Sequence, residues 1–142
     1  INISKNVGIE FEEVFKIQKQ LQEMYGTKFD ENSTIKELAS FWMINKHSIE
    51  DELCEMFDAL GGIDDGIGNA GWKYWKKENS KAKEMKISDL SQGDIKELKY
   101  EIVDVFHFFL NFAISIGMTG NELLSMYINK AKENVNRQSN DY

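Results

Sequence analysis

Apolar residues recur every three or four positions over four long stretches of the chain, which is the spacing of an amphipathic helix. No stretch shows the strict alternation that is typical of a half-buried strand. The chain also contains no proline, which favours long uninterrupted helices. We therefore expect an all-α fold whose helices cover residues 9–25, 34–60, 95–116 and 119–138.

The ends of these helices carry local signals. Thr34 with Glu37, and Thr119 with Glu122, match capping boxes, in which two side chains satisfy backbone N–H groups at a helix start. Residues 91–94 resemble a further start, and glycines at 26, 61, 62 and 117 are expected to end the first three helices. The segment at about 61–93 is interpreted as an inserted loop within a single domain that spans residues 1–142.

The second half of the third helix, residues 105–112, is apolar nearly all round. A helix of this kind must be buried on more than one side. In a chain of 142 residues the expected cover is a second copy of the same chain. The pattern therefore predicts a homodimer.

The charge of the chain narrows the classes of partner. The formal net charge is −7, which disfavours binding to a nucleic-acid backbone, whereas the lysine-rich stretch 72–86 suits a small anion that arrives with its own metal. The longest apolar run, 105–118, is too short to span a membrane, and we see no signal peptide. Cys54 is the only cysteine, so we expect a packed core thiol in a reducing, cytoplasmic compartment.

Two pairs of acidic residues give the clearest chemical signal. Glu52 and Glu55, and likewise Glu101 and Asp104, are three positions apart, so each pair points one way from a largely apolar helix. Four carboxylates on two facing helices repel one another unless cations lie between them. Oxygen ligands suit Mg²⁺, and two or more ions would polarise the phosphates of a triphosphate while a carboxylate takes a proton from water.

Further polar residues have both a structural and a functional interpretation. Gln18 and Gln22 share one face of the first helix, either as solvated glutamines or as readers of a base edge. Trp72 and Lys73 either belong to the core and the solvated surface or meet a sugar or base and a phosphate. His107 is either a core histidine bonded to a carbonyl or a partner of Asp104 near the ligand.

The last helix carries a polar stripe of Tyr127, Lys130, Asn134 and Arg137, with Tyr142 just beyond it. The stripe is either a solvated face or a surface for a phosphate or nucleotide. One cysteine and two scattered histidines do not make a zinc site.

Taken in order, these pieces resemble the dimeric, all-α dUTPases, which are relatives of the MazG-type nucleoside triphosphate pyrophosphohydrolases. The resemblance covers most of the chain. It rests on Gln18, Glu52-x-x-Glu55, the run from Trp72 to Lys76, the run from Glu101 to Phe108, and Tyr127-x-x-Lys130-x-x-x-Asn134-x-x-Arg137-Gln138. It implies a helical bundle of the all-α NTP pyrophosphatase type, completed by dimerisation.

The resemblance further implies Mg²⁺-dependent hydrolysis of dUTP to dUMP and pyrophosphate. The implied metal ligands are Glu52, Glu55, Glu101 and Asp104, and one of the first two would orient or activate the water. Around the base and sugar it places Gln18, Trp72 and His107. Near the phosphates or nucleoside it places residues of which some reach across the dimer, namely Lys73, Lys130, Asn134, Arg137 and Tyr142.

Some positions depart from that family. Gln22 stands where a shorter polar residue is common, Asp141 replaces a usual glycine, and the insert lengthens the spacing from Glu55 to Trp72. Two alternatives therefore stay open. One is a related pyrophosphohydrolase that prefers dCTP or a modified dNTP. The other is a catalytically silent member that binds a protein partner through the insert 61–93.

Overall fold

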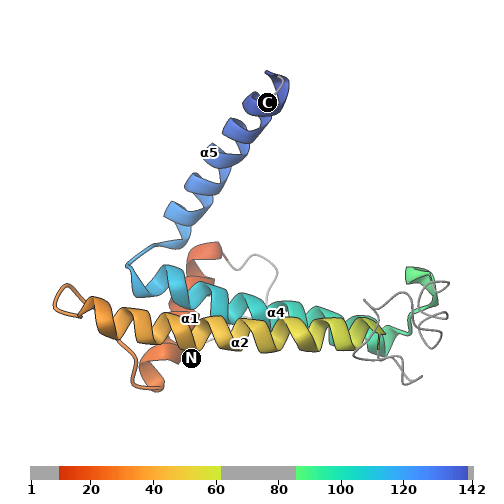
Figure 1. Cartoon of the computed structure of the whole chain (residues 1–142), viewed down its shortest axis with the longest axis horizontal. Helices are drawn as coiled ribbons and strands as arrows, with labels where there is room; N and C mark the ends of the chain where they lie inside the picture. Colours follow the sequence, from red (N-terminus) through yellow and green to blue (C-terminus); the bar gives the residue numbers. More distant parts are fainter. Residues whose placement is uncertain (1–9, 62–85, 141–142) are drawn as a thin grey trace. The chain divides into compact units, whose positions relative to one another are not determined.

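The computed structural model describes residues 10–61 and 86–140, and within these ranges the chain is helical without strands (Figure 1). The elements in chain order are α1 (Phe11–Met24), α2 (Ile35–Gly61), the short 3₁₀-helix η2 (Ile87–Asp89), α4 (Gln92–Ser115) and α5 (Gly120–Ser139). The all-α prediction is confirmed, and each predicted helix is present with nearly the expected bounds.

The predicted signals at the helix ends are also present. At the start of α2, the Thr34 backbone N–H donates to Glu37 Oε2 at 2.7 Å, and the Glu37 N–H donates to Thr34 Oγ1 at 3.2 Å. Ser91 and Asp94 exchange the same two bonds at the start of α4. Gly26 and Gly117 follow α1 and α4 with φ of 81° and 78°, a backbone region that glycine adopts without steric cost.

The chain divides into two compact units. The terminal unit comprises Ile1–Ser40 and Leu110–Tyr142, and the central unit comprises Phe41–Phe109. In the terminal unit, α1 and α5 are in contact, and Phe15 with residues at the end of α4, Leu110 and Ala113, forms a buried apolar core. This division was not predicted from the sequence.

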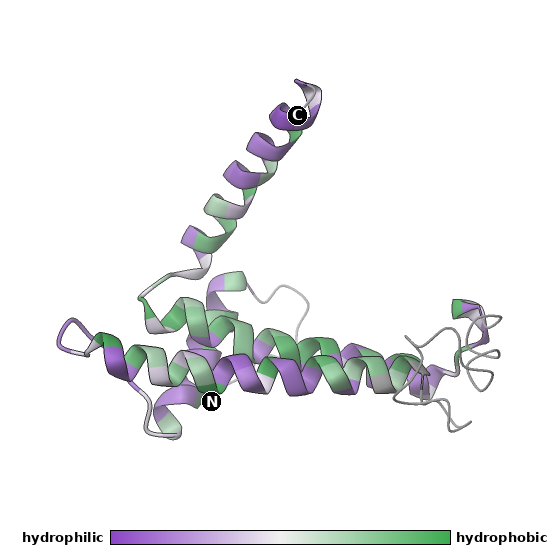
Figure 2. Ribbon diagram, in the orientation of Figure 1, coloured by the Kyte–Doolittle hydropathy of each residue, from purple (hydrophilic) through white to green (hydrophobic). Residues whose placement is uncertain are grey.

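In the central unit α2 and α4 run antiparallel beside each other (Figure 1). Figure 2 shows hydrophobic and hydrophilic bands alternating along α2, while α4 is more uniformly hydrophobic. Several apolar side chains of α4 are nevertheless exposed, including Ile102 at 56%, Val103 at 43% and Phe109 at 46%. The described chain therefore does not provide the all-round cover that the pattern of α4 predicts, and the homodimer stays a prediction.

Three further predictions concern Cys54, a membrane span and the insert 61–93. Cys54 is exposed on α2, so the prediction of a packed core thiol is wrong. Its neighbour Leu53 is also exposed, at 38%, so the described chain does not cover this part of α2. No described helix is by itself long and apolar enough to cross a membrane, and only α4 and α5 as a bent pair reach that length and composition. Most of the insert 61–93 lies outside the described residues.

Candidate functional site

Two helices of the central unit bring predicted acidic residues together. Glu52 and Glu55 lie one turn apart on α2, and Glu101 lies on α4. One carboxylate oxygen from each of these three residues lies within 4.8 Å of the others. Asp104, one turn after Glu101, is not part of that tight group, but its charge acts on Glu52 and Glu101. Three of the four predicted acids therefore lie close together, and the role of all four as metal ligands stays a prediction.

Crowding of like charges changes the acidity of this cluster. Burial, followed by repulsion from Glu55, Asp104 and Glu101, raises the pKa of Glu52 above its ordinary value. Burial, followed by repulsion from Glu55 and Asp104, also raises the pKa of Glu101, although a hydrogen bond with Glu52 partly offsets the rise. Without a counter-ion, the cluster opposes its own ionisation.

One oxygen of the cluster has no hydrogen-bond partner. Glu101 Oε2 is buried, and among the described residues no donor reaches it. A buried carboxylate oxygen without a partner is costly, so such an atom calls for an explanation. A cation held by the three carboxylates would supply the missing partner and remove the repulsion.

The chemistry of the donor atoms indicates which cation fits. The three converging side chains offer only carboxylate oxygens, which are the ligands of hard divalent cations such as Mg²⁺ and Ca²⁺. Zinc sites in proteins mostly use cysteine sulfur and histidine nitrogen instead. The residues present therefore fit a divalent oxygen-liganded ion, and they leave room for water and phosphate oxygens to complete its shell.

His107 lies beside this cluster rather than in the core. Its Nδ1 lies 3.6 Å from Asp104 Oδ1, and both side chains are about half exposed. The prediction of a core histidine bonded to a carbonyl is wrong, because position 107 falls on the side of α4 that also carries Asp104. The arrangement agrees with the alternative of a partner to Asp104.

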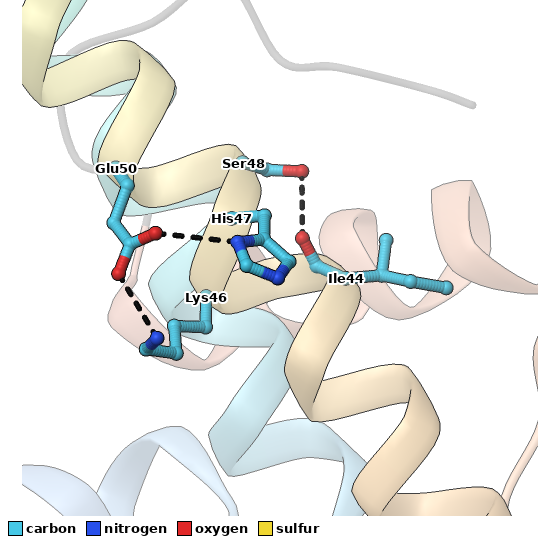
Figure 3. A network of polar contacts seen from close by, with 5 residues as sticks. All are labelled: Ile44, Lys46, His47, Ser48 and Glu50. Atoms are coloured by element: carbon cyan, nitrogen blue, oxygen red, sulfur yellow. Dashed lines mark hydrogen bonds and ion pairs between the residues drawn. The ribbon is translucent and has the colours of Figure 1, made fainter.

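The other histidine belongs to a separate surface network on α2 (Figure 3). Glu50 lies between Lys46 Nζ at 3.1 Å and His47 Nδ1 at 3.3 Å, and hydrogen bonds from these two residues lower the pKa of Glu50. The Ser48 hydroxyl donates to the Ile44 carbonyl one turn earlier at 2.9 Å. Glu50 is therefore a paired surface acid, in contrast to the cluster around Glu101.

The predicted glutamines lie in the terminal unit and are buried. Gln18 is 8% exposed and Gln22 is 7% exposed, so the interpretation of both as solvated helix formers is wrong. The Gln18 Nε2 group donates to Asn111 Oδ1 of α4 at 2.8 Å, and Asn111 is itself 7% exposed. Asn111 was not among the predicted site residues. Its signal in the sequence was a lone amide in an otherwise apolar stretch.

The predicted polar stripe of α5 is exposed, and its two cations pair with a neighbouring acid. Lys130 Nζ lies 3.2 Å from Glu133 Oε2, and the Arg137 guanidinium also pairs with the Glu133 carboxylate. Exposed pairs of this kind contribute little to stability. The remaining predicted contacts Trp72, Lys73 and Tyr142 lie outside the described residues.

Among known proteins similar to this chain are two phage dCTP pyrophosphatases. The one from Enterobacteria phage LZ5 is 41% identical over 104 residues, which are 71% of this chain and 60% of the relative. The one from Enterobacteria phage T4 is 36% identical over 115 residues, which are 80% of this chain and 67% of the relative.

A DNA replication protein of phage T4 is 35% identical over 109 residues, which are 75% of this chain but 28% of that protein. The chain thus spans only part of the length of each of these relatives. No protein-family model matches the chain. No solved structure matches it either.

Proposed function

The chain belongs to the family of the phage dCTP pyrophosphatases, and from this premise we propose that it hydrolyses dCTP to dCMP and pyrophosphate. The observation that carries the proposal is the carboxylate cluster of Glu52, Glu55 and Glu101, with a buried oxygen that lacks a partner. The names of the relatives do not support the preference for dUTP that the resemblance to dUTPases implies, so cytosine replaces uracil in the proposal.

In the proposed site Glu52, Glu55, Glu101 and Asp104 would hold Mg²⁺ through their carboxylate oxygens. The ion would supply positive charge close to the phosphates and the leaving pyrophosphate. A carboxylate oxygen of Glu52 or Glu55 that is free of metal orients a water and accepts its proton. The water oxygen bonds to the α-phosphorus as the bond from that phosphorus to the bridging oxygen breaks, and pyrophosphate leaves with the bond electrons.

The remaining predicted residues bind the nucleotide in this proposal. Gln18 and Gln22 contact the base with their amides, and Trp72 and His107 contact the base or sugar. Contacts to the phosphates or nucleoside come from Lys73, Lys130, Asn134, Arg137 and Tyr142. The exposed position of Lys130 and Arg137 on α5 supports their part, because both guanidinium and ammonium groups bind phosphate oxygens well.

We also propose that the working form is a homodimer in the cytoplasm of the host cell. Exposed apolar side chains on α4 support it, since helix faces of this kind are buried in stable proteins. Light scattering coupled to size exclusion measures the mass directly, and a single species of about 16.5 kDa would contradict the dimer.

A panel of the common deoxynucleoside triphosphates with Mg²⁺ tests the reaction and the base. We expect dCMP and pyrophosphate from dCTP, with slower release from dUTP and little from the purine nucleotides. Chromatography of the products separates dCMP with pyrophosphate from dCDP with phosphate. Turnover of dUTP in preference to dCTP would overturn the assignment of the base. If no nucleotide releases pyrophosphate, then the proposal that the protein is an enzyme is wrong. That result would favour a catalytically silent member of the family that binds a protein partner.

A further inference from the structure

A cavity lies in the terminal unit between the turn that precedes α2 and the end of α4 (Figure 1). Its volume is about 340 Å³, at the small end of the range of about 300 to 1,000 Å³ that ligand sites occupy. All of its described lining residues belong to the terminal unit, and none of them was assigned to the carboxylate cluster or to the nucleotide. The proposed function therefore leaves this cavity without a role.

Apolar side chains from segments far apart in the sequence line the cavity. Phe29 comes from the turn, Ile35 and Leu38 from the start of α2, and Ile116 from the residues after α4. Ile35 is 81% exposed and Ile116 is 57% exposed. A single exposed isoleucine is common on protein surfaces, but two that line one cavity form an apolar patch of the kind found at interaction sites.

The charged residues of the cavity are acidic. Asp30 and Glu31 line it, whereas its described lining residues include no lysine, arginine or histidine. Lys28 and Lys36 are the nearest lysines in the sequence, but neither lines the cavity or forms an ion pair with these acids within residues 10–61 and 86–140. Asp30 Oδ1 accepts the Asn32 backbone N–H at 2.8 Å, which leaves its charge uncompensated. The cavity therefore combines an apolar lining with negative charge.

The start of α2 does not turn this cavity into an anion site. Helix starts attract anions through backbone N–H groups that have no partner within the helix. Here Glu37 Oε2 accepts the Thr34 N–H at 2.7 Å, and Thr34 Oγ1 accepts the Glu37 N–H at 3.2 Å. A phosphate or carboxylate would also meet the charges of Asp30 and Glu31. The ligand that fits is therefore a cation with an apolar part.

We propose that this cavity binds a segment of a partner protein in which an arginine or lysine stands beside apolar residues. The basic side chain pairs with Asp30 and Glu31, and its apolar neighbours cover Ile35 and Ile116. A small free amine satisfies the carboxylates but leaves the two isoleucines exposed to water, which favours a protein segment as the occupant. This interaction goes beyond the proposed hydrolysis of dCTP and does not depend on it.

Three capped tetrapeptides test the proposal by NMR titration. The first alternates leucine and arginine, the second has glutamate in place of arginine, and the third has serine in place of leucine. The backbone amide signals of Ser33 and Gly117 report occupation of the cavity, because both residues line it. We expect the first peptide to bind at least about threefold more tightly than either of the others. Its binding should weaken as salt is added, since salt screens exposed charges.

Two variants separate the contributions of charge and apolar surface. Glu31→Gln removes one carboxylate of the cavity, and Ile35→Ser removes one exposed apolar side chain. The matched controls are Glu23→Gln and Met24→Ser, which change an exposed acid and an exposed apolar residue of the same unit outside the cavity. We expect each cavity variant to weaken binding of the leucine–arginine peptide by about twofold to fivefold, and each control to leave it unchanged. Circular dichroism checks that all four variants are folded.

Three results would overturn the proposal. The first is no binding, equal binding of the three peptides, or equal binding by the cavity variants and their controls. The second is a shift of the Ser33 and Gly117 signals by spermidine at the same concentration as by the peptide, because a free amine would then be the occupant. The third is a shift of these signals with protein concentration alone, since a second copy of the chain would then cover the cavity. No nucleotide is present in these measurements, so their outcome is independent of the proposed reaction.

Discussion

At the scale of single residues, the acid cluster has features that lower the stability of the folded protein, as is common at functional sites. Glu52 and Glu101 have raised pKa values, and Glu101 Oε2 is buried without a partner among the described residues. Each feature disfavours the folded state when the carboxylates are charged. A few residues away, Glu50 shows the ordinary arrangement, with Lys46 and His47 as its partners. The contrast between neighbouring acids of one helix points to the cluster as the chemical site.

Replacement of Glu55 tests that cluster most directly. We expect Glu55→Gln to lower the rate of dCTP hydrolysis by about a hundredfold or more, because a neutral amide is a poor ligand for Mg²⁺ and accepts no proton. The side chain is exposed and the substitution keeps its shape, so the folded state is retained. Steady-state kinetics with circular dichroism measures both.

The matched control is Glu50→Gln, an exposed acid of the same helix that pairs with Lys46 and His47. We expect it to keep a rate within about twofold of wild type, because exposed pairs of this kind contribute little. If both variants keep near-normal rates, then the cluster is not the metal site.

At the scale of elements, α5 is fastened to the terminal unit at its first turn. The Glu12 carboxylate of α1 accepts from the Gly120 N–H at 3.1 Å and from the Asn121 N–H at 2.8 Å, and Thr119 Oγ1 accepts from the Glu122 N–H at 3.1 Å. These bonds satisfy donors that a helix start leaves open, and a negative charge suits that end of the helix dipole. Gly120 is the one buried residue among the described part of α5.

The close approach of α1 to Gly120 predicts an unusual response to alanine. Alanine normally stabilises a helix relative to glycine, but a Cβ at position 120 would lie 3.1 Å from the Glu12 Cα and 3.2 Å from the Glu12 backbone nitrogen. Since backbone atoms cannot easily move aside, we expect Gly120→Ala to lower the free energy of unfolding by about 1 to 2 kcal/mol. Urea denaturation followed by circular dichroism measures this change.

Gly93→Ala serves as the control for this substitution. Gly93 lies in the first turn of α4, and the nearest atom to an added Cβ is the Ser91 hydroxyl oxygen at an ordinary 3.7 Å. We expect this variant to be neutral or slightly stabilised, as helix propensity alone dictates. A stabilised Gly120→Ala protein would mean that α1 does not pack closely against the start of α5.

At the scale of the whole molecule, the distribution of charge links stability to pH and to metal. The formal net charge is −7, and the acid cluster concentrates part of it in one place. A group whose pKa is raised on folding stabilises the folded state below its ordinary pKa, and this contribution is lost as the pH rises through the folded value. Glu52 and Glu101 act in this sense, whereas Glu37 and Glu50, whose pKa values are lowered, act in the opposite sense.

The pH dependence of stability is therefore best measured as the difference between the wild type and a variant that lacks one acid of the cluster. Without divalent metal, we expect the wild type to lose stability relative to Glu101→Gln as the pH rises from about 4.5 to neutrality, because the variant lacks one of the two raised carboxylates. The contributions of Glu37 and Glu50 are common to both proteins and cancel. Thermal unfolding over that pH range, in the presence of a chelator, gives the two profiles.

Addition of Mg²⁺ at neutral pH should favour the stability of the wild type over that of the Glu101→Gln protein. An ion that binds only the folded state raises the unfolding temperature, and removal of one ligand weakens that effect. We expect millimolar Mg²⁺ to stabilise the wild type by more than the Glu101→Gln protein. Parallel pH profiles together with equal effects of Mg²⁺ would contradict a metal site at this cluster.

Local features of the fold were predictable from the sequence by itself. The helices follow from the period of apolar residues, and their ends follow from pairs such as Thr34 with Glu37 and from glycines 26 and 117. The acid pairs were also visible, because residues three apart on a helix must share a face. All of these depend on interactions within a few residues, which local sequence determines.

Contacts between distant segments were decided only by the tertiary structure. No local pattern indicates that Gln18 meets Asn111, that Glu12 caps α5, or that Cys54 is exposed. The structure also decides which carboxylates of the two acid pairs lie within ligand distance and which oxygen of Glu101 lacks a partner. The physical reason is that each of these depends on how helices far apart in the sequence pack, and the periodicity of a helix describes its own faces but not the partner of each face.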